Sequence, residues 1–81
     1  MRIRILHFAS FREAAGRDED VREVAAGTRV ADLWASLGSE IPLFSRFPSI
    51  PPAAVNREYV KNDTLLREGD EVVFLPPVAG G

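Results

Sequence analysis

Cysteine is absent from this sequence of 81 residues, and histidine occurs only once, as His7. Without cysteine the chain has no disulfide, no thiolate nucleophile and no cysteine-ligated metal. A single histidine cannot form a histidine-rich metal site or supply both members of a catalytic histidine pair. We therefore expect no metal site, and any chemistry must use other groups.

Long apolar runs and an excess of charge of one sign are absent too. Ten Lys and Arg residues against twelve Asp and Glu residues give a net charge of −2, whereas a nucleic-acid-binding domain needs a basic face. The first residues carry charge inside their apolar run, unlike a signal peptide, and no segment approaches the length of a membrane span. We expect one small cytoplasmic domain that binds neither nucleic acid nor membrane.

The first quarter of the chain predicts two strands separated by a short helix. Isoleucines alternate with arginines after Met1, which is typical of a strand with one buried face. Ser10 and Glu13 have the spacing of a capping box, and Gly16 suits the end of a helix. The predicted elements are a strand over 2–8, a helix over 11–15 and a strand over 21–24.

The main helix is predicted to begin at Thr28, a suitable N-cap, and to end at Gly38. Between them lies an apolar stripe at helical spacing, made of Val30, Leu33, Trp34 and Leu37. Such a stripe needs a sheet to cover it, so these residues are predicted to lie in the core. Residues 39–52 contain four prolines and predict a loop held by apolar anchors, with room for one helical turn.

The last part of the chain predicts three short strands, over 53–55, 59–60 and 71–75. Turns are predicted at 56–58 and 68–70, where Gly69 tolerates a positive φ. Leu65 and Leu66 are predicted to fill the core before the second turn. Pro76 and Pro77 end the last strand because neither has an N–H for a β-ladder.

This order of elements predicts an α+β fold. Two strands, one long helix and a final strand favour a mixed sheet with the helix across one face, and with the first and last strands as parallel central neighbours. That is the ubiquitin-like β-grasp arrangement. We assign residues 1–75 to the β-grasp domain and 76–81 to an extended, flexible C-terminal tail.

The tail is the first candidate for chemistry. A C-terminal carboxylate has a pKa near ~3.5 and is a poor electrophile at neutral pH, but a partner can activate it as an acyl-adenylate. Gly80 and Gly81 have no Cβ and can thread into a narrow active site, while the two prolines stiffen the base of the tail. The alternative is a frayed chain end that contains two glycines by chance.

Residues 68–81, EGDEVVFLPPVAGG, closely resemble the C-terminal signature of molybdopterin synthase small subunits, the ubiquitin-like sulfur carriers. That signature has a Gly-Asp-Glu-Val turn, a hydrophobic strand, Pro-Pro-Val and a terminal Gly-Gly. Residues 6–16, with Phe8-Ala9 and Arg12-Glu13-Ala14, and the segment Ala54-Val55-Asn56 are also similar to that family. The resemblance is weakest over 39–52.

The resemblance implies a sulfur carrier that acts with two proteins. A ubiquitin-activating-like adenylyltransferase would use ATP to adenylate Gly81, with no cofactor bound permanently, and a sulfur donor would convert it to a thiocarboxylate. The tail would enter the large subunit of molybdopterin synthase, in a heterotetramer with two of each subunit, and sulfur would pass to a pyranopterin. Two loaded carriers would serve each product. The lack of cysteine fits, because sulfur would ride on the terminal acyl carbon.

A partner-binding surface is predicted beside the tail. If Ile3, Ile5, Val72 and Phe74 face the helix, the apolar residues on the opposite face of the same two strands form an open surface of the sheet. These are Leu6, Phe8, Val73 and Leu75, joined by Tyr59, with Pro76, Pro77 and Val78 continuing toward the tip. The alternative is that the loop 39–52 folds over this surface and buries it.

Other residues carry less specific predictions. Arg12 matches an arginine of the family and is either a partner contact or a solvated position on a helix. His7 is interpreted as a partly covered structural residue, and Lys61, the single lysine, is assigned no role. Three alternatives to the first function stay open: a thiamine-type sulfur carrier, a ubiquitin-like modifier joined to lysines, and an interaction module with an inert tail.

Overall fold

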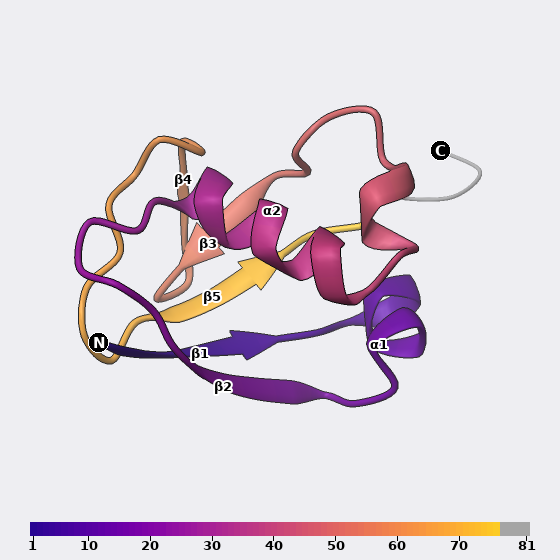
Figure 1. Ribbon diagram of the computed structural model, residues 1–81, viewed down its shortest axis with the longest axis horizontal. Coiled ribbons are helices and arrows are strands. Elements are labelled where there is room, and N and C mark those ends of the chain that lie inside the picture. Colours follow the sequence, from indigo (N-terminus) through magenta and orange to yellow (C-terminus); the bar gives the residue numbers. More distant parts are fainter. Residues whose placement is uncertain (77–81) are drawn as a thin grey trace.

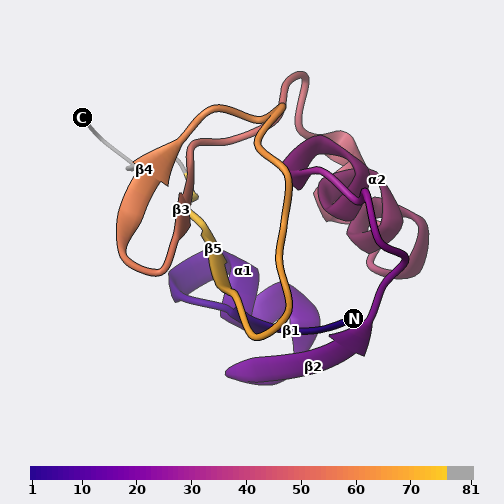
Figure 2. The same ribbon diagram turned by 90° about the vertical axis from the view of Figure 1, so that its left-hand side faces the viewer.

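A computed structural model describes residues 1–76 of the chain. Its sheet has five strands in the order β2-β1-β5-β3-β4, and α2 lies across one face (Figures 1 and 2). The elements are β1 (Arg2–Leu6), α1 (Ala9–Ala15), β2 (Glu19–Glu23), α2 (Val30–Glu40), the 3-10 turn η1 (Phe44–Arg46), β3 (Ala53–Val55), β4 (Glu58–Val60) and β5 (Glu71–Phe74). No helix within residues 1–76 is long and apolar enough to cross a membrane.

The central pair of strands is β1 and β5, which run parallel with Ile5 opposite Val72. β2 and β3 flank this pair in antiparallel register, and β4 pairs with β3. The predicted mixed sheet, with the first and last strands as parallel neighbours, is therefore confirmed.

The core lies between the sheet and α2. The predicted stripe of α2 is buried in full, and the inward residues of β1, including Ile3 and Ile5, have no exposed surface. An aromatic cluster fills the end of the core near α1, with ring centroids 4.9 to 6.1 Å apart. It consists of Phe11, Trp34, Phe44, Phe47 and Phe74. These contacts explain why the loop 41–52, despite its prolines, is held against the fold.

The helix starts differ from the prediction. Helix α1 begins at Ala9 with Phe8 as N-cap and has no side-chain cap, so the predicted capping box of Ser10 is wrong. Helix α2 is capped at Arg29, whose N–H donates to the Asp32 carboxylate at 2.9 Å. The predicted cap, Thr28, instead donates its hydroxyl to a backbone carbonyl. A cap contributes about 1 kcal/mol, less than the burial of one large side chain such as Phe11, so packing decides where α1 starts, whereas α2 starts at the cap that Asp32 provides.

Further predictions, on Gly38, on Leu65 and on the bounds of the strands, are corrected. Gly38 lies inside α2, which continues to Glu40, and a Cβ at residue 38 would meet the Cβ of Ser45 at 3.6 Å. Leu66 is buried as expected, but Leu65 is 50% exposed. The first strand ends at residue 6 rather than 8, and the second spans 19–23 rather than 21–24. The strand predicted over 59–60 begins at residue 58, and the last strand ends at residue 74 rather than 75.

Candidate functional site

One row of apolar residues crosses the open face of the sheet. Leu6 on β1 lies opposite Val73 on β5, Val73 lies opposite Ala54 on β3, and Ala54 lies opposite Tyr59 on β4. Because successive strand residues point to opposite faces, this row faces away from α2. Tyr59 is 78% exposed, while the other three are half-buried.

Two more apolar residues extend this row toward the end of the sheet. Phe8 follows β1 and is 51% exposed, and Leu75 follows β5 and is half-buried. The N–H of Leu75 donates to the carbonyl of Pro52 at 2.8 Å, so the chain stays fixed just beyond β5. We call the six residues Leu6, Phe8, Ala54, Tyr59, Val73 and Leu75 the open-face patch.

The loop 41–52 does not cover this patch. Its residue Phe44 is 1% exposed and stacks on Trp34 in the core, while Phe8 and Tyr59 stay open to solvent. Only Leu75 is flanked by the loop, in a hollow lined by residues 47–52. The structure thus brings the predicted surface residues together on one face, and their role in binding a partner stays a prediction.

The other half of the open face is charged. Arg4 pairs with Glu19 at 2.7 Å and with Glu71 at 3.4 Å, and Arg2 pairs with Glu23 at 3.1 Å. The hydrogen bond with Glu19 raises the pKa of Arg4, and the same bond lowers the pKa of the Glu19 carboxyl. The apolar patch therefore ends against a band of paired charges, which resembles the apolar core and polar rim of a protein interface.

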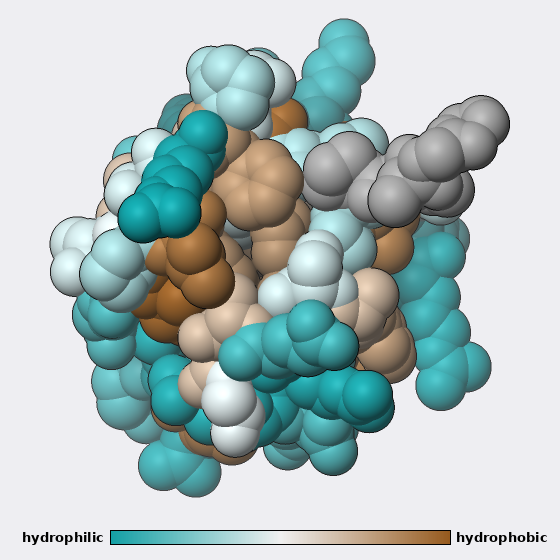
Figure 3. Space-filling model, turned by 90° about the vertical axis from the view of Figure 1, so that its right-hand side faces the viewer, coloured by the Kyte–Doolittle hydropathy of each residue, from teal (hydrophilic) through white to brown (hydrophobic). Residues whose placement is uncertain are grey.

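The tail begins at the end of the sheet where the patch lies. β1 and β5 are parallel, so Phe8 and Leu75, which follow their C-terminal ends, lie at the same end as Pro76. Figure 3 looks onto this end and shows apolar surface between polar groups. Pro76 is the last described residue; the predicted site residues Pro77, Val78, Gly80 and Gly81 lie outside the described part of the chain.

A polar clasp fixes the start of β5. Asn56, in the β3–β4 turn, donates its side-chain amide to the Asp70 carboxylate at 2.9 Å and accepts from the N–H of Glu71 at 3.0 Å. The residue Asp70 is 8% exposed, and the other oxygen of its carboxylate accepts from the N–H of Arg67 at 2.8 Å. The clasp holds the turn before β5 against the hairpin and so sets the position from which β5 leads to Pro76.

Arg12 and His7 lie close to the patch but differ in exposure. Arg12 is exposed, 3.7 Å from Asp18, and lines a hollow beside Leu6 and Phe8. His7, by contrast, is 3% exposed, which is more buried than predicted, and its Nε2 lies 2.9 Å from the Asp20 carboxylate. This places Arg12 at the rim of the patch and makes His7 a structural residue.

Asp20 also accepts a hydrogen bond from Arg17 at 2.6 Å. Burial alone would raise the pKa of this carboxyl, but the hydrogen bonds from Arg17 and His7 outweigh burial and lower the pKa. Asp20 is therefore ionised at neutral pH and links β2 to the end of β1.

Sequence reasoning missed Ala54 as a member of the patch. The signal was present, because Ala54 lies between Ala53 and Val55 in a predicted strand, and both neighbours are buried in the core. The alternation of a strand places the residue between them on the open face. Its small side chain made it inconspicuous.

The sheet order, the helix across one face and the open apolar surface beside the last strand define a ubiquitin-like β-grasp protein. The chain belongs to the ThiS family, whose model matches residues 5–81. It is 36% identical over 83 residues to the molybdopterin synthase sulfur carrier subunit of Chlamydomonas reinhardtii, with 100% of both chains covered. It is 37% identical over 84 residues to the protein of the same name from Mycobacterium tuberculosis, with 100% of this chain and 99% of the relative covered.

Solved structures confirm the predicted fold. A Pyrococcus furiosus protein described as subunit 1 of molybdopterin converting factor superposes with a TM-score of 0.86 at 32% identity, covering 96% of this chain and 99% of that chain. Small archaeal modifier protein 1 of Methanosarcina acetivorans gives 0.77 at 26% identity, covering 99% and 96%. A chain from the Helicobacter pylori complex of subunits 1 and 2 of molybdopterin-converting factor gives 0.68 at 21% identity, covering 100% of both, which shows the fold alone.

Proposed function

We propose that this chain is the sulfur-carrier subunit of a molybdopterin synthase. The observation that carries the proposal is the full-length match to relatives of that name, together with a family match that extends to residue 81. The geometry adds support, because the open-face patch lies at the end of the sheet where β5 leads to Pro76.

The reacting group in this proposal is the carboxylate of Gly81. A carboxylate is ionised at neutral pH and resists nucleophilic attack, so an adenylyltransferase first activates it. A carboxylate oxygen attacks the α-phosphorus of ATP, pyrophosphate leaves, and an acyl-adenylate forms. Hydrosulfide supplied by a sulfur donor then attacks the acyl carbon, the bond from that carbon to the AMP oxygen breaks and AMP leaves, and a thiocarboxylate forms with no change of oxidation state.

The loaded tail then enters the large subunit of the synthase. Gly80 has no Cβ, so the enzyme can close around the backbone next to the reacting carbonyl. The thiocarboxylate sulfur bonds to a carbon of the pyranopterin, and water then cleaves the acyl C–S bond, which leaves the sulfur on the pterin and restores the Gly81 carboxylate. Two loaded carriers complete one dithiolene, which the proposed heterotetramer with two subunits of each kind would supply. The carrier is not an enzyme alone, because its partners supply the activation and the pterin site.

The open-face patch provides the docking energy in this scheme. Phe8, Tyr59, Val73 and Leu75 would be covered by each partner in turn, with Arg12 at the rim. Burying apolar surface contributes roughly 25 cal/mol per Å², whereas the tail must stay slim and offers little area. Recognition through the patch and chemistry through the tip are therefore separate functions of this chain.

Reconstitution of the synthase tests the proposal. The protein is first incubated with ATP, the adenylyltransferase and a sulfur source, and then combined with the large subunit and the cyclic pyranopterin monophosphate. We expect molybdopterin to form in proportion to the loaded carrier and none to form when ATP is left out of the first step. Loading without molybdopterin would instead indicate a thiamine-type carrier.

A modifier function has support of its own, because a solved relative at 26% identity is a small archaeal modifier protein. That function would appear in the same reaction as an amide between Gly81 and a lysine of an added protein. A chain that is neither loaded nor conjugated would be an interaction module with an inert tail, and the proposal would be wrong.

A further inference from the structure

A second apolar surface lies beside α1 and the loop 41–52, away from the open face. A hollow of about 280 Å³ is formed there. Phe11 and Phe44, both buried, form its floor, while Leu43, which is 48% exposed, and Arg46 lie at its edge. The proposed function makes no use of this surface.

The hollow continues to the base of the tail. A neighbouring hollow of about 250 Å³ shares Phe47 with the first and passes Ile50 to reach Leu75. We call the two hollows together the loop trough. Its far end therefore lies at the residue before Pro76, so the trough and the open-face patch flank the base of the tail from two sides and share Leu75.

The trough is formed by packed side chains. Phe44 stacks on Trp34 with centroids 5.1 Å apart, and Phe11 contacts Phe47 edge-on at 5.1 Å. The floor is thus part of the core, and a ligand would meet a rigid surface. A preorganised surface loses little side-chain freedom on binding, while Leu43 at the edge still has half of its surface to bury.

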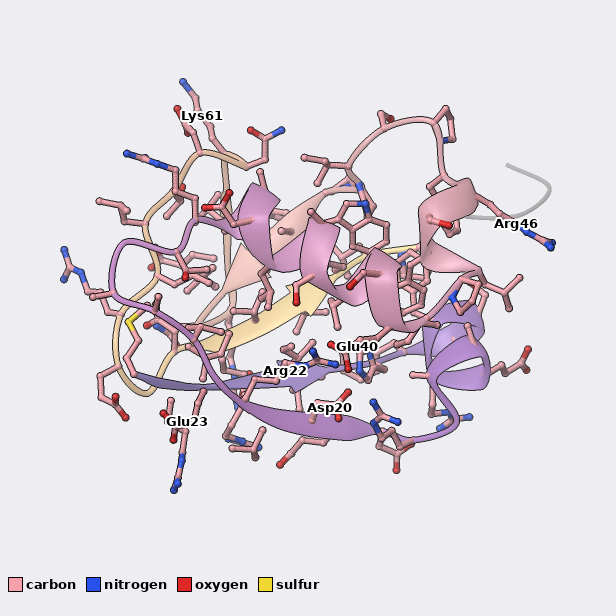
Figure 4. All side chains as sticks on the ribbon, viewed as in Figure 1. Asp20, Arg22, Glu23, Glu40, Arg46 and Lys61 are labelled. Carbon is pink, nitrogen blue, oxygen red and sulfur yellow. The ribbon has the colours of Figure 1, made fainter. Side chains whose placement is uncertain are left out.

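The charge at the edge of the trough is unbalanced. Five arginines, Arg2, Arg4, Arg12, Arg17 and Arg22, are each paired with a carboxylate. No ion pair within residues 1–76 includes Arg29, Arg46, Arg57 or Arg67, and of these four Arg46 is the one that lines the trough. Figure 4 shows the Arg46 side chain pointing outward at the end of the molecule opposite β4. An exposed guanidinium beside apolar surface favours a carboxylate next to an aliphatic or aromatic side chain.

We infer that the loop trough is a second docking surface, and that it receives an apolar segment of the synthase large subunit with a carboxylate opposite Arg46. The inference rests on the proposed function, in which the large subunit holds Gly81. Residues 77–81 can span at most about 18 Å, so a partner that holds Gly81 must approach this end of the molecule closely. The full-length relatives share the name of a subunit of molybdopterin synthase, and we therefore assign the large subunit of that enzyme as the partner.

Calorimetric titration of the whole chain with the large subunit tests this inference. Arg46→Glu and Leu43→Asp are compared with the matched changes Lys61→Glu and Leu65→Asp. Leu65 is 50% exposed against 48% for Leu43, and Lys61 is exposed and lies far from Arg46 in Figure 4. Each trough variant should weaken binding by about tenfold, and the effect of Arg46→Glu should shrink at high salt. The matched variants should bind like wild type, and all four should melt near the wild-type temperature.

Each other outcome overturns the inference. Trough variants that bind the large subunit like wild type show that the trough is not an interface with it. Trough variants that bind the large subunit like wild type, but bind the adenylyltransferase more weakly in a parallel titration, show that the occupant was assigned wrongly. If wild type itself binds no large subunit, the proposed function fails and the inference fails with it. If wild type binds and the trough variants bind equally well, the inference alone fails.

Discussion

Tyr59 offers a sharp separation between partner binding and folding, because most of its surface is open to solvent. An aromatic side chain of this kind presents roughly 200 Å², and Tyr59 is 78% exposed. About 150 Å² is therefore available to a partner, and about 45 Å² is already buried in the free protein. At ~25 cal/mol per Å² these areas correspond to at most about 4 kcal/mol in binding and about 1 kcal/mol in folding.

We expect Tyr59→Thr to weaken binding to the large subunit by about 2 kcal/mol, or about 30-fold. The loss is smaller than the upper value from the buried area because covering the hydroxyl and ordering the side chain both oppose binding. Threonine favours a strand as tyrosine does, so the free energy of unfolding should fall by only about 1 kcal/mol. Phe8 is 51% exposed, so Phe8→Ala should lower binding and stability by similar amounts. Phe74 is 2% exposed, and Phe74→Leu should lower stability alone.

The assay combines calorimetric titration with urea unfolding for the same three variants. The ratio of lost binding energy to lost folding energy should fall in the order Tyr59, Phe8, Phe74. If Tyr59→Thr lowers stability as much as Phe74→Leu, or leaves binding unchanged, the open-face patch is not a docking surface.

Three other predictions concern the clasp, the tip and the response to acid. In Asn56→Gly, glycine tolerates the positive φ of that position, but the side-chain hydrogen bond to Asp70 is lost. The free energy of unfolding should fall by about 2 kcal/mol, seen as a fall in melting temperature of about 10 °C. An unchanged melting temperature would mean that the clasp does not stabilise the fold. Gly80→Ala should slow single-turnover sulfur loading by about 100-fold while Ala79→Gly stays mild, and equal rates for both would refute the argument for a slim tip. The pKa of Asp20 is lowered in the folded state, so its contribution to stability is present above about pH 4 and is lost as pH falls through the folded pKa; Asp20→Asn should therefore be less stable than wild type at neutral pH and equal to it in strong acid, as followed by urea unfolding across pH.

The sheet and the main helix were predictable because their patterns are periodic. Alternation in β1 and the stripe of α2 set which residues are buried, and Ile3, Leu33 and Leu37 are all buried as predicted. Turn signals were also reliable where a backbone needed a special conformation, as at Gly16 and Gly69, both with positive φ.

Cap positions and contacts between distant segments were not predictable. Ser10 and Thr28 have good capping chemistry, but α1 starts elsewhere because the burial of large side chains outweighs a cap worth about 1 kcal/mol, and α2 starts at a different cap, Arg29 with Asp32. The clasp joins Asn56 to Asp70 across fourteen positions, and neither residue alone signals the pair.

The candidate site also has one part that could be predicted from the sequence and one part that could not. The resemblance of the tail and the alternation of β1 and β5 indicated the open-face patch, including Phe8, Val73 and Leu75. The loop trough was out of reach, since its floor comes from α1 and η1 and its edge from an unremarkable arginine, Arg46. Helix α1 and the turn η1 form one surface only because both pack around Phe47.

Tandem mass spectrometry of the loaded protein tests the central claim most directly. After incubation with ATP, the adenylyltransferase and a sulfur source, the C-terminal peptide should carry one sulfur in place of one oxygen, and fragmentation should assign it to Gly81. A variant with one residue added after Gly81 should show no exchange while melting like wild type. Sulfur found at any other residue, or equal loading of the extended variant, would contradict the account of Gly81 as the sulfur carrier.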